Sequence, residues 1–186
     1  DVKGLDVVRS SFPPAFRKFM AEVLEDILND ISKEDLDDKI LNFKEHMKTL
    51  PLIDVMFPIG VKNVKKYTRK GDGIFAVRMK GTPVHVKSAL NYNDMLKHLK
   101  VTKVREIING EKIKWTYLKT NSMGLDTMAM KGFEDPEPIV KFVQSYINYD
   151  KVFKSAFANK LNDFYGAMKW GRIPENNNLG KFFAFG

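Results

Sequence analysis

The residue types that most often carry out catalysis are scarce in this chain of 186 residues. It contains no cysteine, which excludes disulfide scaffolds, thiolate zinc sites and cysteine nucleophiles. The three histidines, His46, His85 and His98, lie far apart in the sequence, and we expect structural or solvated roles for them. No HExxH, phosphate-binding glycine loop or Gly-x-Ser-x-Gly elbow occurs. These patterns indicate a binding or positioning module without catalytic residues of its own.

The carboxylates that stand close together also have a structural explanation. Four acids within residues 34–38 fall in the first turns of an expected helix, where they oppose the positive end of the helix dipole. The acidic pair at 134–135 precedes Pro136 in an expected turn. No carboxylates are spaced for the two-metal site that phosphoryl-transfer enzymes need. We therefore expect no metal ion and no other cofactor on this chain.

The positive charge of the chain is concentrated in its middle third. The formal net charge is +8, yet residues 61–119 alone hold 15 basic and 4 acidic side chains. A localised basic excess is typical of proteins that neutralise phosphates, although a solubilising surface without a partner has the same composition. The densest part, residues 61–73, has little periodicity and is interpreted as a loop. No basic amphipathic helix or long apolar run is present, so we expect no membrane interaction.

Aromatic residues stand among these cations. Tyr67 lies between two pairs of basic residues, and Trp115 lies between Lys114 and Lys119. Cations bind phosphates while aromatic rings pack on sugars or bases, so this interleaving fits nucleic-acid binding. We expect Trp115 to pack in the core. For Tyr67, core packing and contact with a nucleic acid are equally open roles.

The periodicity of apolar residues predicts a helix-dominated α+β fold with a small β-hairpin or sheet. Helices are expected over residues 10–30, 32–49, 83–96, 136–148 and 150–168. Strands are expected over residues 52–57, 74–79, 112–117 and 127–131. Ser10 or Ser11 is expected to cap the first helix and Ser32 the second, and Pro58 is expected to end the first strand.

The C-terminal residues depart from this pattern. Residues 171–181 are polar, without periodicity, and are followed by Phe182, Phe183 and Phe185. We expect an extended tail. Its phenylalanines either pack back onto the domain or bind another protein.

Three stretches of the sequence resemble family B DNA polymerases. KGLDVVRSSFP (3–13) resembles the Lys-Gly to Arg motif at the end of the palm, with Asp6 where many members have Glu. GTPVHVKSALNYN (81–93) and INGEKIKWTYLKTNSMGLDTMAMKG (108–132) resemble the thumb of polymerases of the T-even bacteriophage type. Asn176, Leu179, Phe182 and Phe183 have the spacing of a sliding-clamp-binding peptide, with Asn replacing the usual Gln. The palm aspartates, fingers and exonuclease are absent from the sequence.

The resemblance implies a palm-end segment (1–12), a thumb domain (13–170) whose basic part is 61–119, and a tail (171–186). Such a chain is the non-catalytic C-terminal part of a DNA-directed DNA polymerase. It grips the primer–template duplex through phosphates and docks a sliding clamp through its C-terminal peptide. Its other partner is the palm and fingers portion, where Mg²⁺ is expected. The implied location is the cytoplasm of a phage-infected or bacterial cell. The alternative is a free-standing nucleic-acid-binding accessory module without a polymerase partner.

The candidate DNA-binding residues share a positive charge or an aromatic ring and are Lys3, Arg9, Lys62, Lys65, Lys66, Tyr67, Arg69, Lys70, Arg78, Lys80, Lys87, Lys112 and Lys119. The candidate clamp-binding residues are Asn176, Leu179, Phe182, Phe183 and Phe185. By resemblance, Lys3 and Arg9 are expected near the primer terminus.

Overall fold

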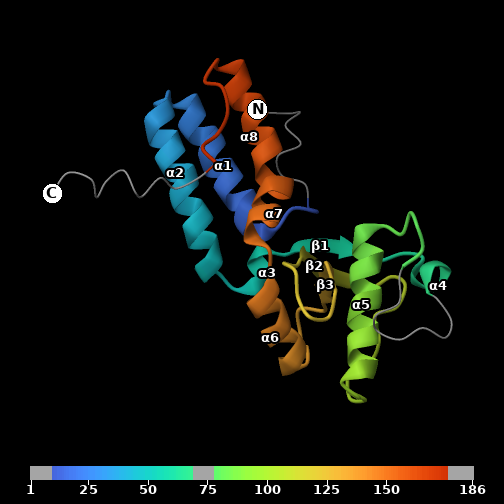
Figure 1. Ribbon diagram of the computed structural model, residues 1–186. Coiled ribbons are helices and arrows are strands. Elements are labelled where there is room, and N and C mark those ends of the chain that lie inside the picture. Colours follow the sequence, from blue (N-terminus) through green and yellow to red (C-terminus); the bar gives the residue numbers. More distant parts are fainter. Residues whose placement is uncertain (1–9, 69–77, 176–186) are drawn as a thin grey trace.

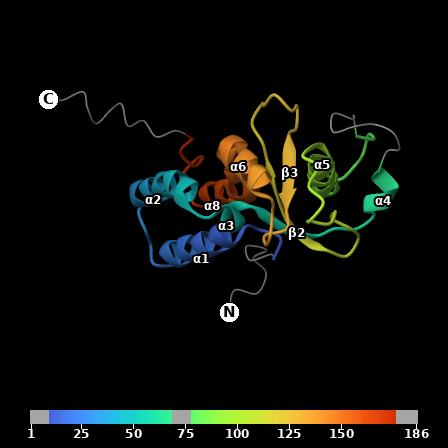
Figure 2. The same cartoon turned by 90° about the horizontal axis from the view of Figure 1, so that it is seen from below.

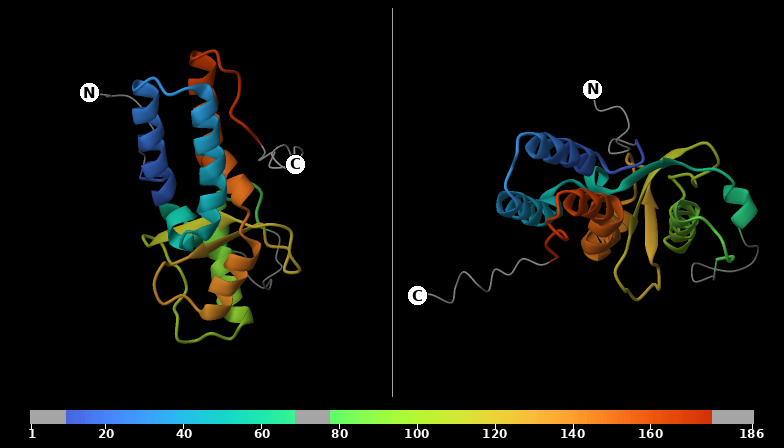
Figure 3. Two further views of the ribbon diagram at one scale, coloured as in Figure 1. Left: turned by 90° about the vertical axis from the view of Figure 1, so that its left-hand side faces the viewer. Right: turned by 90° about the horizontal axis from the view of Figure 1, so that it is seen from above.

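The computed structural model describes residues 10–68 and 78–175 (Figure 1). Over half of the structure is helical, 54%, and a small antiparallel sheet completes it, which confirms the helix-dominated α+β fold. Helices α1, α2 and α8 form a bundle on one side of the molecule, and the sheet and α5 lie on the other side (Figures 1 and 3). None of the helices in the described parts is long and apolar enough to cross a membrane.

The bundle consists of two helices near the N-terminus and a broken helix near the C-terminus. Its elements are α1 (Pro14–Leu28), α2 (Lys33–His46), the 3-10 turn η2 (Met47–Thr49), α7 (Tyr149–Phe153), the π-helical turn η3 (Lys154–Ala158) and α8 (Asn159–Ala167). Phenylalanines fill its core: the ring of Phe16 meets Phe43 edge-on at 5.4 Å and lies 6.2 Å from Phe157. The predicted helix over 150–168 is therefore present, but it is interrupted by the π-helical turn.

The caps of these two N-terminal helices differ from each other. Ser32 caps α2 as predicted, because its hydroxyl accepts a hydrogen bond of 3.1 Å from the Asp35 amide. Neither Ser10 nor Ser11 caps α1, which was predicted wrongly. Pro13 takes the cap position and Pro14 begins the helix, since proline has no amide hydrogen that needs a partner there.

The sheet has three antiparallel strands in the order β1 (Phe57–Gly60), β2 (Lys112–Tyr117) and β3 (Thr127–Met130). Helix α5 (Val84–His98) packs beside β3 (Figure 2), and Asn91 Nδ2 donates to the Thr127 carbonyl at 2.9 Å. Helix α6 (Glu137–Tyr146) follows β3, and the chain then returns to β2 through a bridge between Leu118 and Ile147. These elements confirm the predicted helices after Pro83 and Pro136 and the strands over 112–117 and 127–131.

The first strand was predicted in the wrong place. Residues Leu52–Val55 form a short helix, α3, and the strand begins only at Phe57, with Pro58 inside it. Proline is tolerated because β1 pairs with β2 alone and is an edge strand. The predicted strand over 74–79 lies largely outside the described residues.

The basic stretch that was interpreted as a loop contains one helical turn, α4 (Val64–Tyr67). Val64 is buried and its amide donates to Asn109 Oδ1 at 2.7 Å. This side-chain contact, with a residue 45 positions away, holds the turn beside the start of β2.

A candidate nucleic-acid interface

Three lysines line a groove where β1 pairs with β2. Lys112 and Lys114 lie on one face of β2, since they are two residues apart in a strand, and Lys131 follows β3. The groove has a volume of about 470 Å³. We call it the lysine groove, and its remaining lining includes Ser10, Pro58 and Gly60.

The register of the sheet explains why the groove is open. Pro58 pairs with Lys114, and Gly60 pairs with Lys112. Neither Pro58 nor Gly60 carries a long side chain, so the aliphatic parts of Lys112 and Lys114 have few side-chain atoms to pack against on β1. A β-carbon at Gly60 would find no heavy atom within 4 Å. The two lysine side chains, placed beside these small residues, leave space on the strand pair for an extended ligand.

The charge of the lysine groove is not neutralised within the described part of the chain, where none of its three lysines forms an ion pair. Other cations of the basic region are paired: Lys87 with Asp126 at 2.7 Å, Lys97 with Glu106 at 3.0 Å and Arg105 with Glu111 at 2.7 Å. An unpaired cluster of cations is an electrostatic site for a polyanion.

Asp135 shapes the groove without neutralising it. Its oxygens accept hydrogen bonds from the amides of Lys131 at 2.9 Å and Gly132 at 2.8 Å, and from the Tyr92 hydroxyl at 2.8 Å. These bonds fix the turn that presents Lys131. Burial, with the hydrogen bond to Asp135, raises the pKa of Tyr92, so its hydroxyl stays a donor at neutral pH. Tyr92 is fully buried and is not available to a base.

A second basic group follows β1 directly. Lys62, Lys65 and Lys66 are exposed on and before α4, and Lys62 lies two residues beyond Gly60 of the lysine groove. We call these three residues the basic turn. The Lys66 ammonium lies 5.3 Å from the centre of the Tyr67 ring. Tyr67 is half-buried, and part of its ring packs against the core.

The remaining candidates do not join these two groups. Lys80 is exposed in the turn before α5, and Lys87 is paired with Asp126. Lys119 is exposed and follows the C-terminal end of β2, whereas Lys112 begins the strand. The rise of a strand therefore puts Lys119 roughly 20 Å from Lys112. Trp115 is buried and stacks on Phe57 at 4.7 Å, as expected for a core residue.

Arg78 does not present its charge to a ligand. Its side chain is only 8% exposed and forms an ion pair with Asp94, and Nη2 also donates to Asn91 Oδ1 at 3.1 Å. Removing a guanidinium from these partners would leave a half-buried carboxylate without its counter-ion. We therefore leave Arg78 out of the interface.

Several candidates lie outside the described residues, namely Lys3, Arg9, Arg69, Lys70, Asn176, Leu179, Phe182, Phe183 and Phe185. Ser10, however, is described and lines the lysine groove. The Lys-Gly to Arg motif therefore ends one residue before a groove residue.

Three residues of the lysine groove were not predicted from the sequence, namely Ser10, Lys114 and Lys131. The alternation around Lys112 would have placed Lys114 on the same face of the strand. No sequence signal would have brought Lys131 there, because its position depends on the register of β3 against β2, in which Lys114 faces Met130.

Groups for acid–base or metal chemistry are not assembled at this surface. Within residues 10–68 and 78–175, no three or more histidine, aspartate or glutamate side chains form a set that could hold a metal ion. Burial lowers the pKa of His85, so it adds no positive charge at neutral pH. The arrangement can bind an anion by charge and geometry.

No protein-family model and no curated protein sequence matches this chain.

Proposed function

We propose that this chain is the thumb part of a family B DNA polymerase of the T-even bacteriophage type. It grips the primer–template duplex through phosphates and contributes no catalytic residue. The observation that carries the proposal is the unpaired lysine groove. It lies two residues before the basic turn, and its lining includes Ser10, which directly follows Arg9 of the motif that resembles the end of the palm. The proposed partners are primer–template DNA, the palm and fingers portion, and a sliding clamp bound by the C-terminal peptide, which a pull-down against a clamp tests.

The spacing of the lysines suits a nucleic-acid backbone. Side chains at i and i+2 of a strand are about 7 Å apart, which is close to the through-space distance between neighbouring phosphates of one DNA strand, since the rise of 3.4 Å per phosphate is measured along the helix axis only. Lys112 and Lys114 thus contact successive phosphates without reading a base. Lys62 and the rest of the basic turn extend this contact past the end of β1. Phosphate contacts of this kind position a duplex without sequence preference.

Binding to duplex DNA tests the proposal by its salt dependence. Six lysines, three in the lysine groove and three in the basic turn, give an expected slope of log affinity against log salt of about −5. Replacing Lys112 and Lys114 by alanine should weaken binding to all sequences alike and reduce the slope by about 2. Fluorescence anisotropy with a labelled primer–template between low and physiological salt measures both quantities.

The matched control replaces two exposed lysines that form no ion pair within the described residues, Lys154→Ala with Lys169→Ala, and should leave affinity and slope nearly unchanged. A wild-type slope near zero, or equal effects of the two double variants, would contradict the proposal.

The alternative function, a free-standing accessory module, is distinguished by the ligand that binds best. A thumb should prefer the primer–template duplex to a single strand of the same length, because the lysines are spaced for a regular backbone. A single-strand-binding module should show the reverse preference, supported by aromatic stacking. Tyr67, whose ring lies 5.3 Å from the Lys66 ammonium, is half-buried, which favours the thumb.

A further inference from the structure

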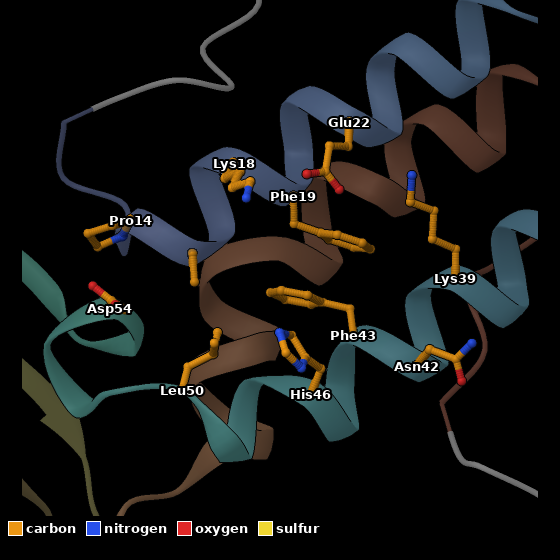
Figure 4. A pocket seen from close by; sticks show the side chains of 11 residues that line it. Pro14, Lys18, Phe19, Glu22, Lys39, Asn42, Phe43, His46, Leu50 and Asp54 are labelled. Atoms are coloured by element: carbon orange, nitrogen blue, oxygen red, sulfur yellow. The ribbon is translucent and has the colours of Figure 1, made fainter.

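A second groove lies between α1 and α2 and shares no lining residue with the lysine groove (Figure 4). Its volume is about 550 Å³. Phe19 of α1 and Phe43 of α2 form its floor, with their rings stacked 4.0 Å apart at an angle of 5°. Ala15 and Leu50 add apolar walls, and Figure 4 shows Phe19 and Phe43 directed between the two helices. We call it the phenylalanine groove.

We propose that the phenylalanine groove binds the C-terminal peptide of the same chain, residues 176–186, through Phe182 and Phe183. The proposal depends neither on DNA binding nor on the proposed clamp: the groove holds the peptide in the free chain, and a clamp would compete with the groove for the same phenylalanines. It concerns a different surface and a different segment from the lysine groove.

The exit of the chain from the described structure favours this occupant. The Glu175 carbonyl accepts a hydrogen bond of 2.7 Å from Lys44 Nζ on α2, and the Ile173 amide donates to Asn162 Oδ1 at 2.9 Å. The chain is thereby held against α2, the helix that supplies Phe43 to the groove. Residues 176–186 therefore follow from the flank of α2 that faces away from the groove, one helix diameter from their proposed site.

The length of the peptide is sufficient. Lys44 and Phe43 lie on different flanks of α2, so the peptide must cross a helix about 10–12 Å in diameter. Seven residues from Glu175 to Phe182 span up to about 23 Å when extended. Phe182 and Phe183 can therefore reach the groove floor from their own chain.

The size and the charge of the groove fit this peptide. A cavity of roughly 150 Å³ accepts one benzene molecule, so 550 Å³ leaves room for two phenyl side chains. Lys39 also lines the groove but is paired with Asp26. The other charged lining residues, Lys18, Glu22 and Asp54, form no ion pair within the described part of the chain, so one negative charge is left over on the rim. The only charged side chain in residues 176–186 is Lys181, next to Phe182. A basic residue beside two phenylalanines complements an acidic rim around an apolar floor.

Disulfide trapping tests the proposal cleanly, because the natural chain contains no cysteine. Ala184→Cys places one thiol beside the phenylalanines and leaves both rings intact. Lys18→Cys on α1, or Asn42→Cys on α2, places the second thiol on a wall of the groove. In the full-length chain, mild oxidation should form the intramolecular disulfide with either wall.

The matched control is Glu45→Cys, on the flank of α2 that lies next to Glu175. A peptide without a preferred site would reach Glu45→Cys at least as fast as the groove. Docking should make both groove positions react about tenfold faster than Glu45→Cys, because the bound peptide raises the local thiol concentration. Adding Phe182→Ala with Phe183→Ala should remove that difference.

Three outcomes would overturn the proposal. The first is a reaction at Glu45→Cys that is as fast as the reaction at both groove positions. The second is an unchanged rate after the two phenylalanines are replaced. The third is a disulfide-linked dimer in place of the monomer at dilute concentration, which would assign the groove to a second copy of the chain.

Discussion

The basic residues of the middle third differ in role although their charge is the same. Arg78 is buried against Asp94, Lys87 is paired with Asp126, and Lys112 and Lys114 have no counter-ion among the described residues. Charge counted along a sequence therefore overestimates the charge available to a ligand. What distinguishes these residues is the presence of a carboxylate within reach in the folded chain.

Asp135 is a polar residue near the lysine groove whose single replacement should lower stability. Asp135→Ala removes the acceptor for two amides and leaves the buried hydroxyl of Tyr92 unpaired. We expect a loss of about 1–3 kcal/mol in the free energy of unfolding, measured by urea denaturation. Glu137→Ala, on the exposed start of α6, serves as the control and should change stability by less than about 0.5 kcal/mol.

Tyr92→Phe provides the second arm of this test. In the wild type it should destabilise by about 1 kcal/mol, since one hydrogen bond is lost. In the Asp135→Ala background it should be neutral or stabilising, because the hydroxyl it removes is already unpaired. Equal effects in both backgrounds would show that the two residues do not interact.

At the scale of elements, turns outside the strands determine where the basic groups lie. The Gly110 amide donates to the Val61 carbonyl at 2.8 Å, and the Val61 amide donates to the Glu111 carbonyl at 2.9 Å. These two bonds continue the pairing of β1 with β2 past Gly60. They place the basic turn directly after the lysine groove.

Gly110→Ala should destabilise this connection. Gly110 has a φ of +89°, a conformation that side chains with a β-carbon rarely adopt. We expect a loss of about 1–2 kcal/mol, measured by thermal or urea unfolding. Gly60→Ala is the matched control, because its backbone is not in the left-handed region and the added methyl meets open space. A loss as large for Gly60→Ala would contradict this reason.

At the scale of the whole molecule, a buried tyrosine joins distant segments in each half. The Tyr92 hydroxyl links α5 to the turn before α6, and the Tyr165 hydroxyl donates to Asp37 Oδ1 at 2.7 Å, linking α8 to α2. Burial and the hydrogen bond to a carboxylate raise the pKa of both tyrosines above the ordinary value of 10.0. The folded protein thus holds both phenolic protons more tightly than the unfolded chain.

Stability should consequently fall at alkaline pH. The contribution of both tyrosines is complete below pH 10, where the unfolded chain also keeps its protons, and is lost as the pH rises above that value. Each tyrosine contributes a slope of up to about 1.4 kcal/mol per pH unit. Urea unfolding at pH 9 and pH 11 should show a smaller decline for Tyr92→Phe with Tyr165→Phe than for the wild type.

The control for this measurement is Tyr146→Phe, whose hydroxyl makes no hydrogen bond within the described part of the chain. It should decline with pH as the wild type does, which separates the two tyrosines from the titration of lysines. An identical alkaline decline in the double variant would contradict the assignment.

The sequence by itself determined the fold class and most elements, because apolar periodicity and capping residues act locally. The capping by Ser32 and the helix after Pro83 follow from neighbouring residues alone. The strand expected before Pro58 was misplaced, since tolerance for proline depends on whether a strand lies at the edge of a sheet.

Only the tertiary structure decided which cations form a site. Strand register brought Lys131 to Lys114, and a carboxylate on α5 neutralised Arg78. The phenylalanine groove likewise exists because α1 and α2 pack side by side and stack Phe19 on Phe43. Such pairings join residues far apart in the chain, and no local pattern encodes the distance between them.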